Sequence, residues 1–171
     1  MKNGSKLAIR DLSLIAVLTT ILFVQEQLLT FIPNVQLTVF LIVLYSKKLG
    51  FVKTSIITII HVLLDNLFLG GINLYYTPAM LVGWLIIPTT LKTIFKNVHS
   101  NISLAILGAI YSFIYCWIYI IPNVILFKFN YIDYLIADIP FEIILVVSSF
   151  VSILLLYNPI SKIFTKFNIG D

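Results

Sequence analysis

The chain has little charge for its length. Of its 171 residues, 11% are charged and 60% are hydrophobic, whereas a water-soluble domain carries about 25% charged and roughly 45–50% apolar residues. So few charged side chains cannot cover the surface of such an apolar chain in water. The composition therefore predicts an all-α integral membrane protein that forms one domain over residues 1–171.

Cysteine is almost absent, and the positive charges do not gather on one face. Cys116 is the only cysteine, which excludes a disulfide framework and a cysteine-based metal site. The net charge is +4, but the lysines and the single arginine occur singly or in pairs. This spacing argues against nucleic-acid binding.

Motifs that would indicate catalysis or nucleotide hydrolysis are also missing. The sequence contains no Walker A, GxSxG or HExxH pattern, so it does not predict an enzyme or a chain that powers transport by hydrolysing ATP itself. We expect no cofactor and no metal.

Six apolar stretches are candidates for transmembrane helices, each judged against the ~20 residues that a helix needs to cross the hydrocarbon core. The stretch at 35–45 is short, and a short, tilted or partly interfacial helix is possible there. The six ranges are 7–32, 35–45, 51–69, 73–91, 102–122 and 134–157.

The positive charges favour a topology with both termini in the cytoplasm. With six spans, only Lys128 faces outside, which is a strong positive-inside pattern. Omitting the second span would move Lys47, Lys48 and Lys53 outside. The ten cations placed inside are Lys2, Lys6, Arg10, Lys47, Lys48, Lys53, Lys92, Lys96, Lys162 and Lys166.

Most acidic residues fall in the outer half, where a polar site open to the outside would explain them. Asp138 and Glu142 are four residues apart and share a helix face, which Ser149 continues. Acids within a span usually face the bundle or a wet cavity, so this pair is a candidate ligand site. Alternatively, Asp138 is an interfacial residue before Pro140, close to the first turn of the helix.

Aromatic residues form a second candidate wall. Tyr111, Tyr115 and Tyr119 recur every four residues, and Asn123 follows; this stripe suits a flat heterocycle, or else an interfacial aromatic belt. On the fourth span, Trp84 near mid-depth needs a partner for its N–H, in a cavity or on another helix. Tyr76 shares its broad face.

The polar residues around the first loop are either a lid over a site or solvated loop residues. They include Glu26 at the end of the first span, and Asn34 and Gln36 after Pro33. On the third span, His61 and Asp65 are spaced for a hydrogen-bonded pair that satisfies both side chains structurally. Ser13, Ala16 and Thr20 give a stripe of small residues on the first span, suited to internal packing or to docking of another membrane protein.

The chain resembles the substrate-binding S components of energy-coupling factor (ECF) vitamin transporters over nearly its whole length. The resemblance rests on AVLTT at 16–20, FIPNVQ at 31–36 and GW at 83–84, together with the size and the basic cytoplasmic loops. The docking motif of that family is usually Ala-x-x-x-Ala, and here it reads Ala16-x-x-x-Thr20.

The resemblance implies a multi-pass protein of the bacterial cell membrane that captures a vitamin or its precursor from outside. A coupling transmembrane subunit and two cytoplasmic ATPase subunits would be its partners. The residues expected at the ligand are Glu26, Gln36, Tyr76, Trp84, Tyr115, Tyr119, Asn123, Asp138 and Glu142, and those expected at the docking surface are Ser13, Ala16 and Thr20.

The acids and tyrosines favour a small aromatic ligand that bears an amine or hydroxyl, such as a hydroxymethylpyrimidine, pyridoxine or thiamine-like compound. The lack of a lysine or arginine in the expected cavity argues against folate-like acids. Competing hypotheses are a self-sufficient ion-coupled transporter using His61 and Asp65, a membrane enzyme acting on lipid, and a structural membrane subunit.

Overall fold

The computed structural model describes residues 8–169, and all of its regular secondary structure is α-helical. Lys2, Lys6 and Asp171, which the sequence assigned to the cytoplasmic side, lie outside these residues. The helices are α1 (Ile9–Leu29), α2 (Thr38–Lys48), α3 (Gly50–Phe68), α4 (Tyr76–Lys92), α5 (Asn101–Phe127) and α6 (Tyr131–Lys166).

Each expected apolar stretch contains one helix, but the last two helices are longer than the sequence indicated. α5 continues through Pro122 to Phe127, and α6 runs from Tyr131 to Lys166 with Pro140 and Pro159 inside it. A proline removes one backbone hydrogen bond without having to end a helix that packing holds in place. The expectation that Pro140 lies near the first turn is therefore wrong, and Asp138 is well inside the helix.

Four of the described helices, α1, α3, α5 and α6, are long and apolar enough to cross a membrane. At a rise of 1.5 Å per residue, the 27 residues of α5 and the 36 of α6 extend about 40 and 54 Å. Both exceed the ~30 Å hydrocarbon core of a bilayer. These lengths and compositions indicate a multi-pass membrane protein.

Helix α2 is the centre of the bundle. Its 11 residues begin with eight that are all buried, 38–45, and it packs on α1, α3, α4, α5 and α6. A helix that is apolar all round is a buried one. The short helix expected for this stretch is therefore present, and protein covers its first eight residues.

A sharp turn joins α2 to α3. The backbone N–H of Leu49 closes α2 on the carbonyl of Tyr45, and Gly50 then takes a φ of +79°. This left-handed conformation is available to glycine at little cost. The turn lets α3 start at once beside α2, so both helices enter one compact bundle.

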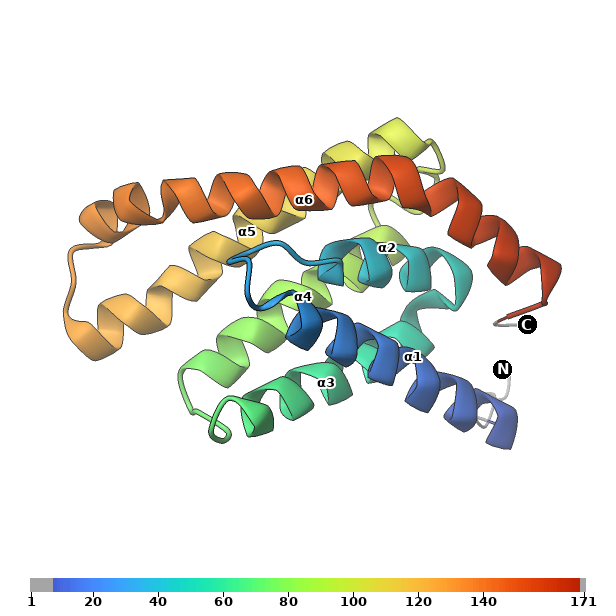
Figure 1. Ribbon diagram of the computed structural model, residues 1–171, viewed down its shortest axis with the longest axis horizontal. Helices are drawn as coiled ribbons and strands as arrows, with labels where there is room; N and C mark the ends of the chain where they lie inside the picture. The colour runs from blue at the N-terminus through green and yellow to red at the C-terminus, as the bar shows by residue number, and fades with distance from the viewer. Residues whose placement is uncertain (1–7, 170–171) are drawn as a thin grey trace.

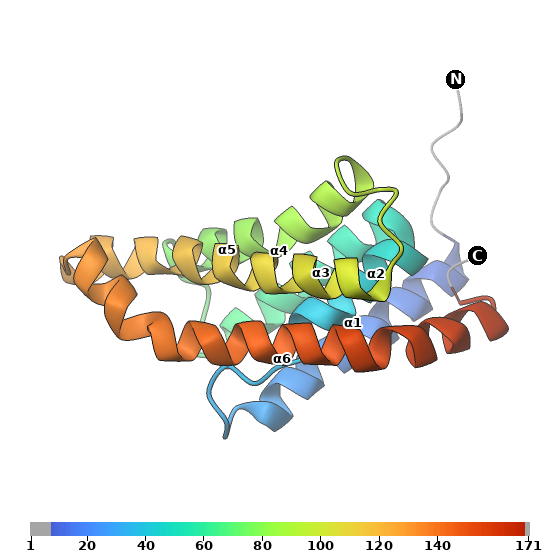
Figure 2. The ribbon, with the colours of Figure 1, turned by 90° about the horizontal axis from the view of Figure 1, so that it is seen from above.

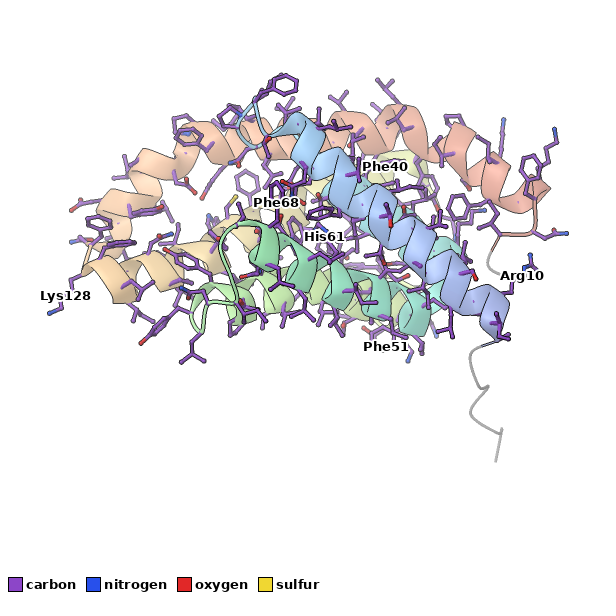
Figure 3. The ribbon with its side chains drawn as sticks, turned by 60° about the horizontal axis from the view of Figure 1, so that its bottom comes forward. Arg10, Phe40, Phe51, His61, Phe68 and Lys128 are labelled. Atoms are coloured by element: carbon purple, nitrogen blue, oxygen red, sulfur yellow. The ribbon has the colours of Figure 1, made fainter. Side chains whose placement is uncertain are left out.

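The helices form a bundle in which α5 and α6 run side by side as a long hairpin (Figures 1 and 2). Among the described helices, α1 packs only on α2 and α3, and it lies on the outside of the bundle (Figure 3). The first and last described residues are at the same end of the molecule (Figure 1).

That end carries most of the positive charge, and we call it the basic end. It includes Arg10, which lies opposite to Lys128 (Figure 3). Lys47 donates to the carbonyls of Phe95 and Lys96 at 2.9 and 3.2 Å, and Lys53 lies 2.8 Å from Asp11. These contacts join the α4–α5 loop and the start of α1 to the central helices.

The burial of α2 predicts its sensitivity to truncation. Ile42→Ala should lower the free energy of unfolding by about 2–5 kcal/mol, because it leaves a cavity in a fully buried helix. Unfolding in a mixed detergent series measures this. Val17→Ala, at a position on α1 that is 57% exposed, is the matched control and should change stability by less than about 0.5 kcal/mol. Equal effects of the two changes would contradict a central α2.

Candidate functional site

A cavity of about 370 Å³ opens at the end of the bundle away from the basic end. Five helices and the α1–α2 loop contribute to its wall, so residues far apart in the sequence meet there. Its lining residues are Glu26, Asn34, Gln36, Asp65, Leu69, Met80, Tyr115, Cys116, Tyr119, Ile120, Asn123, Tyr134, Asp138, Phe141 and Leu145.

The first wall is the polar end of α1, residues 25–27, which attaches this helix to its neighbours. Gln25 donates to the Thr38 hydroxyl at 2.9 Å and accepts from the Leu37 N–H at 2.8 Å. Gln27 donates to Oδ1 of Asp65 at 2.9 Å. These bonds fix α1 to the start of α2 and to α3, and they hold Glu26 at the cavity.

Glu26, and not Asp65, is the side chain closest to the imidazole of His61. Nε2 of His61 lies 3.1 Å from Oε2 of Glu26, although the alignment is too poor for a hydrogen bond, and His61 is fully buried. The expected hydrogen-bonded pair of His61 and Asp65 is therefore wrong, because Oδ1 of Asp65 accepts from Gln27 and, within residues 8–169, neither imidazole nitrogen has a hydrogen-bond partner.

The α1–α2 loop covers one side of the cavity and is attached to α6. Asn34, at a φ of +59°, donates its side-chain N–H to the carbonyl of Phe141 at 2.9 Å. The backbone N–H of Gln36 donates to the Ser148 hydroxyl at 3.2 Å, and that hydroxyl lies 3.0 Å from the Gln36 carbonyl. Few bonds hold the loop to α6, and most of them involve side chains.

The second wall is a ladder of aromatic rings from α4 and α5. Tyr115 stacks on Trp84 with ring centroids 3.8 Å apart and an interplanar angle of 16°. Tyr119 stacks next to it at 5.6 Å, and Tyr76 lies 5.3 Å from Tyr119. The Tyr76 hydroxyl donates to Oδ1 of Asn123 at 2.6 Å, which fixes the outermost ring.

Gly83 makes room for this stack. A Cβ at this position would lie 2.7 Å from Cδ2 of Tyr115, and Tyr115 cannot retreat because Trp84 lies against its ring. The Trp84 indole is buried at 1% exposure, and its N–H has no hydrogen-bond partner within residues 8–169. The position of the Tyr115 ring at the cavity is thus set by packing against Trp84.

The third wall is the first half of α6, where Tyr134 and Asp138 line the cavity. Asn130 caps the start of this helix by accepting from the Ile132 N–H at 2.9 Å. Glu142, one turn beyond Asp138, is buried at 3% exposure. The indole of Trp117 interacts with its carboxylate, while Oε1 has no hydrogen-bond partner in the described part of the chain.

Six of the nine side chains that the sequence singled out line the cavity, and three lie behind its wall. Trp84 supports Tyr115, Tyr76 supports Tyr119 and Asn123, and Glu142 lies beside Asp138 and Cys116. The six that line it are Glu26, Gln36, Tyr115, Tyr119, Asn123 and Asp138.

The sequence-based site omitted several lining residues. Asp65 was assigned to a structural pair with His61, whereas it lines the cavity. Tyr134 begins the expected sixth span, and its spacing of four from Asp138 was a usable signal. Met80 shares the fourth-span face of Tyr76 and Trp84, which was also a usable signal. Cys116 offered none, because an apolar side chain within a span does not reveal whether it faces lipid or a cavity.

The small-residue stripe on α1 faces away from the bundle. Ser13, Ala16 and Thr20 are all exposed. The hydroxyls of Ser13 and Thr20 donate to the carbonyls four residues earlier, at 3.2 and 2.9 Å. The stripe therefore presents a smooth surface whose polar groups are satisfied within α1.

Comparison with known proteins found no matching family model, no matching curated protein and no matching solved structure. The interpretation of the cavity therefore rests on its own side chains.

The contact between Gly83 and Tyr115 predicts the effect of a single methyl group. Gly83→Ala should separate Tyr115 from Trp84 and lower the free energy of unfolding by about 1–3 kcal/mol, as overpacking does. In a Trp117→Phe background, the emission of Trp84 reports the loss of stacking. Val82→Ala, on the exposed face of the same helix, should leave that emission unchanged, and an unchanged spectrum for Gly83→Ala would refute the close approach.

Proposed function

We propose that this protein is the substrate-capture subunit of an ECF-type importer in a bacterial membrane, binding a small water-soluble vitamin or precursor. The observation that carries the proposal is the polar and aromatic cavity of about 370 Å³ at one end of an apolar bundle. A cavity of this size suits a small organic solute. The sequence resemblance supplies the family.

The charge distribution supports an outward-facing cavity. Eight of the nine described cations, all except Lys128, belong to segments that the six-span topology places in the cytoplasm, and the basic end lies opposite to the cavity. By the positive-inside rule the basic end faces the cytoplasm. In this arrangement α2 and α4 also cross the membrane as short helices shielded by their longer neighbours.

The α1–α2 loop is the element that would admit and retain the solute. Its attachments to α6 are the Asn34–Phe141 bond and the bonds between Gln36 and Ser148, each worth only about 0.5–1.5 kcal/mol. Opening them exposes the cavity while residues 25–27 stay bound to α2 and α3. Solute binding would favour the closed loop through contacts with Asn34 and Gln36.

The exposed stripe of Ser13, Ala16 and Thr20 is the proposed docking surface for the coupling transmembrane subunit. Small residues let helices approach closely in a membrane, and among the described helices α1 packs only on α2 and α3, which leaves this side of it uncovered by them. Two cytoplasmic ATPase subunits would supply the work of transport, since this sequence has no Walker A motif.

A second candidate function is a self-sufficient ion-coupled transporter. The buried contact between His61 and Glu26 beside Asp65 supports it, because ionisable groups within a membrane often form proton relays. Solute flux from this chain alone in liposomes, driven by a proton gradient and without an ATPase, would favour this candidate over capture.

The capture proposal predicts tight, saturable binding by the purified protein in detergent. One compound of a panel of vitamins and precursors should change the intrinsic tryptophan emission with a dissociation constant below about 1 μM. Tyr115→Ala should weaken this binding at least tenfold, because it removes a stacking face. Ile125→Ala, at an exposed position of the same helix, is the control and should leave the binding unchanged. If no compound of the panel changes the emission of a folded sample, capture is contradicted.

The six-span topology predicts which positions a membrane-impermeant thiol reagent can reach. In a Cys116→Ala background, Lys128→Cys should react in intact cells, whereas Lys96→Cys should react only after the membrane is permeabilised. The opposite labelling pattern would show that the protein has the reverse orientation in the membrane. Equal labelling of the two cysteines would show that they lie on the same side, which excludes an odd number of spans between positions 96 and 128.

A further inference from the structure

Acidic side chains from two separate groups of helices line the cavity. Glu26 and Asp65 line it from α1 and α3, and Asp138 lines it from α6 with Glu142 buried one turn away. Within residues 8–169, no lysine or arginine is among the lining residues. Among the described residues, His61 is the basic side chain that contacts one of these acids, at 3.1 Å from Glu26.

The protein itself uses only part of each carboxylate. Oε2 of Glu26 contacts His61 and Thr38, and Oδ1 of Asp65 accepts from Gln27. Oε1 of Glu142 is buried without a hydrogen-bond partner in the described part of the chain. One oxygen of Glu26 and one of Asp65 therefore remain available on the first side, and the Asp138 carboxylate on the second, with Glu142 buried behind it.

Unpaired carboxylates in an apolar bundle are costly, and a cation or a hydrogen-bond donor offsets the cost. Among the described residues, no three histidine, cysteine or acidic side chains come together in a way that could hold a metal ion. The acids are instead distributed over two walls, which is the arrangement that an extended organic cation would match.

The space between the acidic walls is aromatic. Tyr115, Tyr119 and Tyr134 line it, and the stack on Trp84 fixes the ring of Tyr115. Tyrosine faces attract both flat rings and positively charged nitrogen. The walls thus favour a flat body in the middle and basic groups at its ends.

From these contacts, and resting on the proposed capture function, we infer that the solute is an aromatic cation with basic nitrogen groups at two ends. One nitrogen lies against Glu26 and Asp65, and the other lies against Asp138, behind which Glu142 adds negative charge. The Glu26–Asp65 side holds the stronger charge, because two carboxylates line the cavity there. An anionic solute would find no positive partner on either wall.

Four benzene derivatives of graded charge test this inference on the full-length protein. They are 1,4-bis(aminomethyl)benzene, benzylamine, benzyl alcohol and benzoate. Each is tested for slowing the alkylation of Cys116 by N-ethylmaleimide, followed by intact mass; Cys116 is the only cysteine and lines the cavity. The intrinsic tryptophan emission of the unchanged protein gives a second readout that does not depend on the reactivity of Cys116.

The diamine should bind at least about tenfold more tightly than benzylamine, since each charged hydrogen bond contributes at least that factor. Benzyl alcohol and benzoate should bind more weakly than either amine. Glu26→Gln should weaken both amines about tenfold, whereas Asp138→Asn should weaken only the diamine. Asp133→Asn removes the same charge from an exposed position of α6 outside the cavity lining, and it should change neither.

Two outcomes would overturn the inference and leave the capture function standing. One is a vitamin that saturates the cavity while benzyl alcohol or benzoate binds as well as the amines. The other is that a vitamin saturates the cavity but neither the diamine nor benzylamine binds, as judged by Cys116 alkylation and by tryptophan emission. Equal weakening of diamine binding by Asp133→Asn and Asp138→Asn would also overturn it, because the effect of Asp138 would then be long-range electrostatics and not a contact with the ligand. If none of the four benzene derivatives and no compound of the vitamin panel binds, both the inference and the capture function are refuted.

Discussion

The cavity depends on how three consecutive polar residues are satisfied at the end of an apolar helix. Hydrocarbon offers no hydrogen-bond partner, so Gln25, Glu26 and Gln27 must find partners within the protein. Successive helix residues point about 100° apart, and one short segment therefore reaches both the start of α2 and the side of α3. This attachment places the α1–α2 loop, and with it the rim of the cavity, against α6.

The aromatic wall follows a different rule, because its geometry is set by steric fit. Tyr115 can stack on Trp84 only where α4 has no side chain, at Gly83. The Trp84 indole gains no hydrogen bond from this position, so dispersion and burial hold it. A polar wall held by hydrogen bonds and an aromatic wall held by packing thus enclose one space, and a solute that fills it contacts both.

The helices were predictable from the sequence, but their partners were not. Apolar runs identified each helix, and the positions of Tyr115, Tyr119 and Asp138 on shared faces indicated a site. Spacing reports only which side chains share a face of one helix, so His61 and Asp65 appeared to be a pair. The side chain that lies against His61 comes from α1, and nothing in local sequence specifies which helix packs there. The length of α6 was also missed, since proline limits a helix only where packing does not hold it.

The two ends of the molecule differ in charge in a way that bears on transport. In the proposed orientation, the acidic cavity faces outside and the basic end faces a cytoplasm at negative potential. A cation held between Glu26 and Asp138 is drawn inward by about 2.3 kcal/mol per elementary charge for each 100 mV. The carboxylates oppose this, because they stabilise the cation on the outer side. A subunit that binds tightly enough to capture a scarce cation therefore cannot release it inward by potential alone, and an ATP-driven partner would supply the difference.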